Sequence, residues 1–308
     1  MRRVDAGDDA APVALDAGAA DAGTPATRRP PPRPDVDDGP PAPELVLLLN
    51  EVRWDQGEDW ERIGFDLDGL VTVPGEHDVE CLAAAAGEPP SDGDFGTDNA
   101  LGQQIVPLLL ISTPDAETAA RTSQAEGIGA LLVRVRDWNG GDDPSVTADV
   151  LSTGGRATSG IVVSESALIA GDPERPLVRD DAAYVTGGLL VARLPDRAPL
   201  PIAFGASTVT VRLTDAMLVV ELGGGTATLA GRWSLADLID VAPQLGMCGD
   251  DERALFRLLD LAADIRTIPG TGGEGVVCDA VSAGIELRVE PAGIAGVGPA
   301  PEHPPLCP

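Results

Sequence analysis

The sequence predicts a mainly β protein of the α+β class, in which antiparallel, sandwich-like sheets carry helical insertions near residues 99–125 and 234–266. Short apolar segments with alternating polar residues recur along the chain, separated by glycine and proline. Expected strands and helices come in blocks, whereas a doubly wound parallel sheet needs them to alternate. Aromatic residues make up only 3% of the 308 residues, so we expect an aliphatic core.

Acidic residues dominate the charge of the chain, and lysine is absent. Fifty Asp and Glu residues stand against 21 Arg residues, and the net charge is −29. This charge repels nucleic acid and anionic membrane surfaces and favours the binding of cations. Nucleic-acid binding is therefore excluded as a function class.

The first 44 residues predict a disordered tether. They consist mainly of Asp, Ala, Gly, Pro and Arg, and such a segment cannot bury enough apolar surface to offset its chain entropy. Residues 30–34, PPPRP, favour a stiffer polyproline stretch, for which a spacer is the main interpretation and an SH3-type ligand the alternative. Residues 299–308 form a second Pro-rich segment, which we expect to be a tail.

Residues 45–196 are expected to form a β-rich domain. The apolar run at 45–54 predicts its first strand, and a looser alternation at 60–73 predicts the next. Further strands are expected on both sides of the turn Asn139–Asp142, which joins two alternating segments in a hairpin-like arrangement.

Two consecutive helices are expected within this domain, between residues 99 and 125. Asp98 or Asn99 is the candidate N-cap of the first helix, and Pro107 should kink or end it. The segment Thr113–Glu117 has the composition of a second helix start.

Residues 197–298 are expected to form a second β-rich segment that ends in helices, with a boundary near Arg197; packing as one domain with residues 45–196 is the alternative. Ser234 is the candidate N-cap of one helix, and the acidic run Asp250–Glu252 begins another. A final strand is expected in the segment AVSAGIELRVEPAG.

The four cysteines, Cys81, Cys248, Cys278 and Cys307, lack the CxxC spacing of a zinc site. A bridge between Cys248 and Cys278 would attach the last amphipathic helix to the following strand and leave Cys81 for Cys307. Four cysteines allow three pairings, so the connectivity stays open. The composition of the tether and the nearly terminal Cys307 favour an oxidising compartment over a cytosolic protein with four reduced thiols.

The stretch IGFDLDGLVT, residues 63–72, matches the nucleophile motif of haloacid-dehalogenase-type phosphohydrolases. In that chemistry Asp66 would attack phosphorus, Asp68 would act as acid and base, and Mg²⁺ would neutralise the phosphate. LLLIST at 108–113 and Gly249–Asp251 imitate two further motifs of the family. The family also needs a lysine, rarely an arginine, and a parallel α/β sheet; the chain has no lysine, and its blockwise pattern predicts no such sheet.

The same aspartates fit a cation site. Calcium is bound by six to eight oxygen ligands on flexible loops, and the glycine-rich stretch SDGDFGTDNALG supplies more of them. If the two loops meet, the candidate metal ligands are Asp66, Asp68, Asp92, Asp94, Asp98 and Asn99. The alternative is that these residues only form turns and helix caps.

Several stretches resemble a family of uncharacterised secreted or lipid-anchored bacterial proteins. They are the N-terminal tether, GFDLDGLVT, DGDFGTDNALG, LLVRVRDWNGGDDPSVT and CDAVSAGIELRVEPA. The resemblance implies an extracytoplasmic location and paired cysteines, and it brings no known activity. Related chains place a cysteine where this chain has Val73, so the resemblance leaves the partner of Cys81 open.

We therefore expect a non-catalytic periplasmic or cell-surface protein with a candidate calcium site and a surface or glycan ligand. Membrane attachment is expected only through a lipid anchor upstream of Met1, because no apolar window in the chain approaches the roughly 20 residues of a spanning helix. The alternative is a hydrolase, either a phosphatase of the haloacid-dehalogenase type or an enzyme that acts on glycans.

Overall fold

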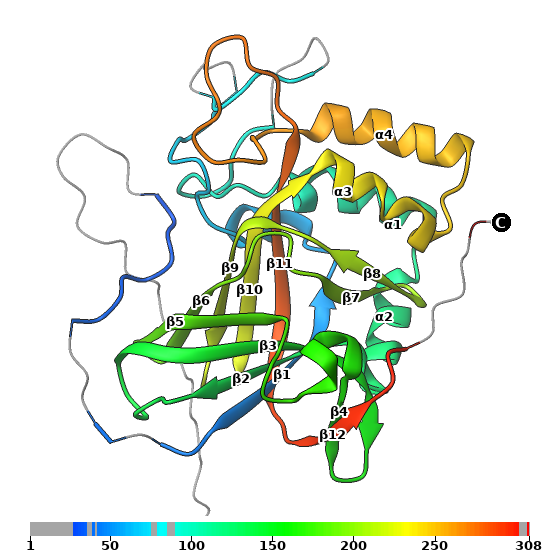
Figure 1. Ribbon diagram of the computed structural model, residues 1–308. Helices are drawn as coiled ribbons and strands as arrows, with labels where there is room; N and C mark the ends of the chain where they lie inside the picture. Colours follow the sequence, from blue (N-terminus) through cyan, green and yellow to red (C-terminus); the bar gives the residue numbers. More distant parts are fainter. Residues whose placement is uncertain are drawn as a thin grey trace, which may run out of the picture.

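Eight antiparallel strands close into a barrel in the computed structural model, which describes residues 27–35, 39–40, 42–74, 79–84, 90–301 and 307 (Figure 1). Neighbouring strands of the barrel follow one another in chain order, with insertions. Around the barrel they are β1 (Leu45–Arg53), β2 (Ile128–Arg136), β3 (Asp143–Ala157), β5 (Val178–Thr186), β6 (Leu189–Arg193), β9 (Thr214–Glu221), β10 (Gly225–Ser234) and β11 (Ala280–Pro291).

Two pairings close the barrel and overturn the expected sandwich. β1 lies between β2 and β11, so that Leu47 pairs with Val133 on one side and with Pro291 on the other. β3 also pairs with β5, where Val150 lies opposite Val178. A sandwich has two separate sheets with free edges, whereas these pairings join all eight strands into one ring.

The long strand β3 contributes to two structures. Its first half pairs with β5 in the barrel, and its second half pairs with β4 (Gly160–Ser164) outside the barrel. β12 (Ile294–Gly298) then adds to β4 in the parallel direction. The pairings of β3 contain register shifts, and irregularities of the bulge type bend a strand and allow it to change partners.

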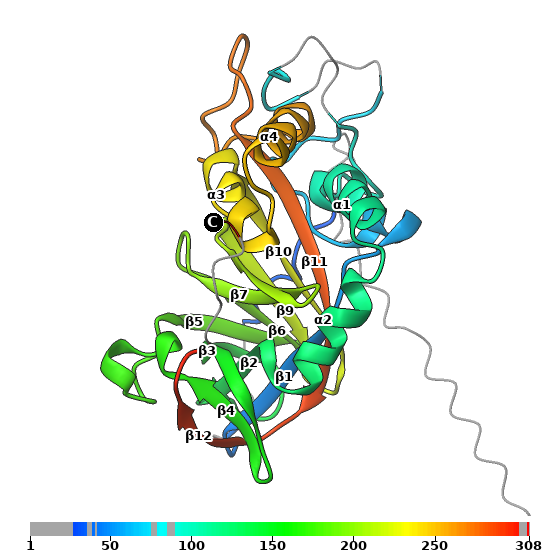
Figure 2. The same ribbon diagram turned by 90° about the vertical axis from the view of Figure 1, so that its right-hand side faces the viewer.

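A hairpin and several helices are inserted between the barrel strands, and Figures 1 and 2 show α1, α3 and α4 grouped at one end of the barrel. The hairpin consists of β7 (Leu200–Phe204) and β8 (Ser207–Val211). The helices are η1 (Gly57–Arg62), η2 (Leu101–Ile105), α1 (Val106–Ser112), α2 (Ala116–Ala125), η3 (Glu165–Ala167), η4 (Ile169–Gly171), α3 (Leu235–Ile239), η5 (Ala242–Leu245) and α4 (Asp250–Ala262). Among the described residues, no helix is long and apolar enough to cross a membrane.

One aliphatic core fills the barrel and continues under the inserted elements. Leu47 and Leu49 of β1 are completely buried in this core, together with Leu131 of β2. Ile202 of β7 and Leu259 of α4 belong to the same cluster. Strands from both expected segments, 45–196 and 197–298, therefore share one hydrophobic core.

The helix cap predicted at Ser234 and the helix break predicted at Pro107 are both present in the structure. The Ser234 hydroxyl accepts a hydrogen bond from the backbone N–H of Asp237 and caps α3 as expected. Pro107 lies in the first turn of α1, where its missing N–H is tolerated. The preceding turn, Leu101–Ile105, is π-helical, so the break expected at Pro107 takes the form of a change in helix type.

All four cysteines form disulfides, but with a different connectivity from the bridge considered above. Cys81 pairs with Cys278, and Cys248 pairs with Cys307. The bridge between Cys248 and Cys278 is therefore wrong. Proximity to the same helix in sequence suggested it, whereas the fold places Cys278 beside the loop that carries Cys81, through the backbone pairing of Leu82 with Val277.

Part of the expected tether lies against the barrel. The backbone N–H of Arg28 donates to the carbonyl of Phe95, and the Tyr184 hydroxyl donates to the carbonyl of Pro31. The Arg33 guanidinium lies 4.9 Å from the centre of the Tyr184 ring. Residues 27–35 thus contact the folded domain, and residues 1–26 of the expected tether and 302–306 of the expected tail lie outside the described residues.

Candidate cation site

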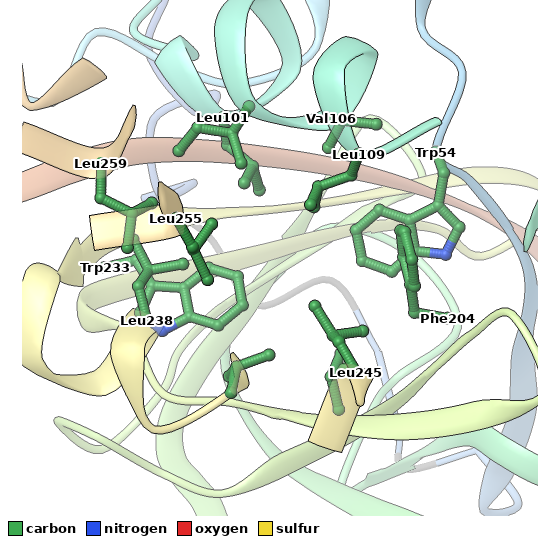
Figure 3. A pocket seen from close by; sticks show the side chains of 13 residues that line it. Trp54, Leu101, Val106, Leu109, Phe204, Trp233, Leu238, Leu245, Leu255 and Leu259 are labelled. Carbon is green, nitrogen blue, oxygen red and sulfur yellow. The ribbon is translucent and has the colours of Figure 1, made fainter. Parts of the chain in front are cut away.

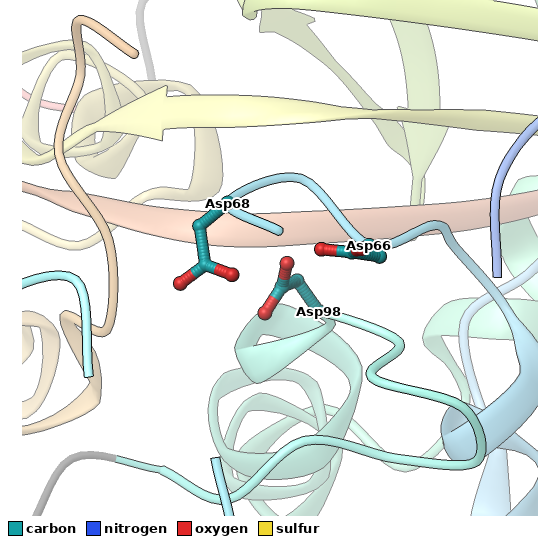
Figure 4. Close-up of side chains that lie close together, drawn as sticks. All are labelled: Asp66, Asp68 and Asp98. Carbon is teal, nitrogen blue, oxygen red and sulfur yellow. The ribbon is translucent and has the colours of Figure 1, made fainter. Parts of the chain in front are cut away.

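Two acidic loops that are distant in sequence meet beside β10 and β11. The loop after η1 carries Asp66 and Asp68, and the loop before η2 carries Asp98; Phe65 and Asp98 form an antiparallel backbone bridge between them. The three carboxylates each offer an oxygen within 4.8 Å of the others (Figure 4). The convergence on which the cation interpretation depended is therefore present for these three residues.

Asp98 ties the two loops together. Its backbone N–H donates to the carbonyl of Phe65 at 3.0 Å, and its Oδ2 accepts the N–H of Leu67 at 2.6 Å. The residue is only 2% exposed. This burial and the bond to Leu67 fix one carboxylate oxygen of Asp98 against the DLDG loop.

The DLDG segment forms a tight turn around its own carboxylates. Asp66 Oδ1 accepts the N–H of Gly69, and Asp68 Oδ1 accepts the N–H of Leu70. Gly69 has a φ of +85°, a conformation that side-chain-bearing residues rarely adopt. The turn interpretation of Asp68 and Gly69 is thus correct, and the same turn positions both carboxylates in the cluster.

Asp92 extends the cluster on its outer side. It pairs with Thr72 through two backbone-directed bonds: its N–H donates to the Thr72 carbonyl at 3.0 Å, and its Oδ2 accepts the Thr72 N–H at 2.6 Å. A side-chain hydrogen bond also joins Asp92 to Asp98. Asp92 therefore borders the three central carboxylates.

Burial and the charges of neighbouring carboxylates raise the pKa values of Asp68, Asp92 and Asp98. Burial, followed by the charges of neighbouring acids, raises the pKa of Asp68 to about 6 and that of Asp92 to about 7. The pKa of Asp98 lies well above its usual value, because of its burial and the charges of Asp68 and Asp92. Ionisation of these carboxyl groups in the folded protein therefore costs free energy, which a bound cation would offset.

Two of the expected ligands do not belong to the cluster. Asp94 pairs with Arg62 at 2.8 Å. Asn99 is buried and structural: its Oδ1 accepts the N–H groups of Gly102 and Gly284, and its Nδ2 donates to Gln56. Its bond to Gly102 has the pattern of a helix cap, in agreement with the alternative interpretation of Asn99.

Three charged residues beside the cluster were missed in the sequence. Asp264 accepts both the N–H and the hydroxyl of Ser282, and burial raises its pKa to about 7. Arg232 is 1% exposed and donates to Glu80 at 2.7 Å and to the carbonyl of Leu67 at 2.5 Å. Arg232 and Asp264 follow Asp66 by more than 160 residues, so the closed barrel is needed to bring them to this place.

The elements around the cluster differ from those of a haloacid-dehalogenase-type phosphohydrolase. Asp66 lies in a loop beside an antiparallel barrel, whereas the family places its nucleophile at the end of a parallel strand. The segment 108–113 belongs mostly to helix α1, and Asp250 begins helix α4. The surroundings of the DLDG turn therefore give the phosphohydrolase alternative no structural support.

The fold and the cluster define an antiparallel β-barrel protein with an acidic loop site at one end. No family model, no curated protein and no solved structure matches the chain. The resemblance to a family of secreted or lipid-anchored proteins therefore stays a prediction.

Proposed function

We propose that this chain is a non-catalytic extracytoplasmic protein in which calcium, bound by Asp66, Asp68 and Asp98, fixes two loops to the barrel. The observation that carries the proposal is the meeting of three carboxylates whose oxygens lie within 4.8 Å of one another. Calcium accepts such flexible sets of oxygens from separate loops.

The geometry of the donors supports a hard divalent cation. Asp68 commits one oxygen to a backbone N–H and keeps the other for an ion. Asp98 accepts the Leu67 N–H with Oδ2, and an ion would replace its side-chain hydrogen bond with Asp92. Oδ1 of Asp66 accepts the N–H of Gly69, and its Oδ2 lies 3.5 Å from the Arg29 guanidinium. An ion would replace this long contact with Arg29. Waters would complete a calcium shell, as they do in weaker extracellular sites with Kd values of roughly 10⁻⁴ to 10⁻³ M.

The disulfides support the location that we propose. Two bridges, Cys81–Cys278 and Cys248–Cys307, engage every cysteine of the chain. Disulfides persist in oxidising compartments and are rare in the cytosol. Calcium is also abundant outside the cytoplasm, so the two parts of the proposal are mutually consistent.

The test is the effect of calcium on thermal unfolding. Calcium at a hundredfold excess over its Kd should stabilise the protein by about 2.7 kcal/mol, and differential scanning calorimetry at pH 7.5 should show a melting temperature several degrees higher than in EDTA. Asp98→Asn should abolish this rise. The same variant should be more stable than the wild type in EDTA, since the substitution removes one of the repelling charges.

Asp94→Asn is the matched control, because Asp94 lies in the same loop and pairs with Arg62 outside the cluster. This variant should keep the full calcium response. Equal calcium responses of the wild type and Asp98→Asn, or no response in the wild type up to 10 mM calcium, about tenfold above the weak end of the expected Kd range, would contradict the proposal.

A further inference from the structure

An apolar cavity lies between the helices and the β7–β8 hairpin. The chain has four Trp, four Phe and one Tyr, and three of these nine, Trp54, Phe204 and Trp233, line this one cavity. Its volume is ≈ 40 Å³. Figure 3 shows leucines of α1, α3 and α4 completing the wall.

The aromatic side of the cavity is held firmly. The indole N–H of Trp54 donates to the carbonyl of Ala203 at 2.8 Å, and its ring meets that of Phe204 edge to face at 5.1 Å. None of the 13 side chains that line the cavity is charged. A water molecule needs two to four polar partners, so this space is suited to an apolar group.

An open groove of ≈ 720 Å³ lies against the outside of this cavity. Leu109, Phe204 and Leu245 line both spaces, so these side chains lie between the groove and the cavity. The groove runs between the α1–α2 corner, the β7–β8 turn and the beginning of α4. Its size lies in the range of small-molecule sites.

The charged residues of the groove are both acidic. Asp115 precedes α2 and Asp251 lies in the first turn of α4. Both are exposed, and neither side chain has an ion pair or a hydrogen bond with another described residue. No arginine lines the groove. The rim therefore favours a positive charge and repels a carboxylate or phosphate.

We propose that this groove binds a single-chain amphiphile with a cationic head group, such as an alkylammonium compound. The alkyl chain lies along the groove and passes Leu109 so that its end enters the cavity beside Trp54 and Trp233. The head group remains in water between Asp115 and Asp251. Apolar burial supplies the affinity, and the two carboxylates select the charge of the head group.

The experiment uses the whole protein in EDTA, so the cation site does not contribute. The neutral dye N-phenyl-1-naphthylamine should gain fluorescence on binding to the groove. Dodecyltrimethylammonium, dodecanol and laurate, all below their micelle or solubility limits, are then compared as competitors. The cationic amphiphile should displace the dye at a concentration about three- to tenfold lower than laurate, as expected for two partly exposed charge contacts.

Variants assign the binding to this groove. The double variant Asp115→Asn and Asp251→Asn should remove most of the preference for the cationic head group and leave dodecanol binding unchanged. Ala254→Gln, at an exposed position of α4 that lines the groove, should weaken all three competitors. Asp260→Asn is the control, because it removes a charge from the same helix at a position that does not line the groove.

Three results would overturn the proposal. The first is a wild-type protein that leaves the dye fluorescence unchanged. The second is equal displacement by the cationic amphiphile and laurate. The third is an affinity that Ala254→Gln leaves unaltered, which would place the dye elsewhere and assign the groove to another occupant, such as a protein partner.

Discussion

At the scale of single residues, buried arginines supply the structural ion pairs of this chain, which contains no lysine. Arg232 of β10 reaches out of the barrel wall and donates to Glu80, to Leu67 and to the carbonyl of Arg266. These three partners belong to loops on both sides of the acidic cluster. The guanidinium thus joins the DLDG turn to the barrel, and its charge also lowers the pKa of Asp68 against the larger effect of burial.

Replacement of this arginine should destabilise the protein strongly. Arg232→Met keeps most of the apolar stem and leaves Glu80, whose side chain is 9% exposed, without its cation. A broken buried pair costs about 3–5 kcal/mol, and urea unfolding should show a loss of this size in the free energy of unfolding. Addition of Glu80→Gln to this variant should recover part of the loss, because the unpaired charge is removed.

Arg257→Met is the control for this prediction. Arg257 is exposed on α4 and makes no ion pair with the described residues, so its replacement should change the free energy of unfolding by no more than about 0.5 kcal/mol. A similarly small effect of Arg232→Met would show that the buried pair does not hold the loop.

The candidate site was predictable only where its residues lie in short motifs. The spacing of Asp66 and Asp68 and the nearby loop of Asp98 suggested oxygen ligands, and the three carboxylates do meet. Asp94 lies in the same glycine-rich acidic loop, but its carboxylate pairs with Arg62 outside the cluster. Asp264 follows helix α4 in a stretch with no motif, and contacts of this segment with Ala280 and Ser282 of β11 bring it close.

At the scale of elements, helix starts were predictable because capping is a local interaction. Ser234 and Asp237 are three residues apart, and the structure joins them by two hydrogen bonds, from the Asp237 N–H to the Ser234 hydroxyl at 3.1 Å and from this hydroxyl to the Asp237 carboxylate at 2.7 Å. Arg197 adds an ion pair to the same carboxylate at 2.7 Å. The short helix α3 is therefore anchored mainly through its N-terminus.

Removal of this cap should destabilise the helical end of the barrel. Ser234→Ala leaves the Asp237 N–H without its acceptor, and we expect a loss of about 1 kcal/mol in the free energy of unfolding measured in urea. Ser159→Ala, at the exposed turn between β3 and β4, is the control and should have almost no effect. Equal values for the two variants would show that Arg197 and the packing of α3 suffice without the cap.

The strand connections were less accessible to sequence reasoning than the helix caps. The alternation of apolar and polar residues predicts individual strands. It does not show that β7 and β8 form a separate hairpin or that β4 lies outside the barrel. Nothing local distinguishes these strands from those of the barrel. Their partners are decided by packing across the whole core, which is why a sandwich was predicted in place of a closed ring.

At the scale of the whole molecule, the barrel closes by joining the two ends of the folded chain. β1 begins at Leu45 and pairs along β11, which ends at Pro291. The bridge between Cys81 and Cys278 connects the same two parts of the chain close to the acidic cluster. The cluster therefore lies where the first and last thirds of the protein meet, and its charge state should influence the stability of the entire fold.

The stability of the calcium-free protein should accordingly fall as the pH rises. The pKa of Asp68 is raised to about 6 and those of Asp92 and Asp264 to about 7, whereas an unfolded aspartate has a pKa near 4. The folded state thus binds these protons more tightly than the unfolded state. The stabilisation is fully present below pH 4 and is lost as the pH rises to about 7, by at most ~1.4 kcal/mol per pH unit for each titrating group.

Melting temperatures measured in EDTA between pH 4 and pH 8 test this dependence. Asp264→Asn keeps an acceptor for the Ser282 N–H, can donate its amide NH2 to the Ser282 hydroxyl oxygen, and cannot ionise. Its curve should therefore be flatter and should lie above the wild-type curve at pH 8. Glu126→Gln removes one exposed charge from the surface and should preserve the wild-type slope, which separates the cluster from the general repulsion of 29 excess negative charges. Calcium should restore the wild-type melting temperature above pH 7, because the ion takes the place of the lost protons; a slope that neither calcium nor Asp264→Asn reduces would locate the pH dependence outside the cluster.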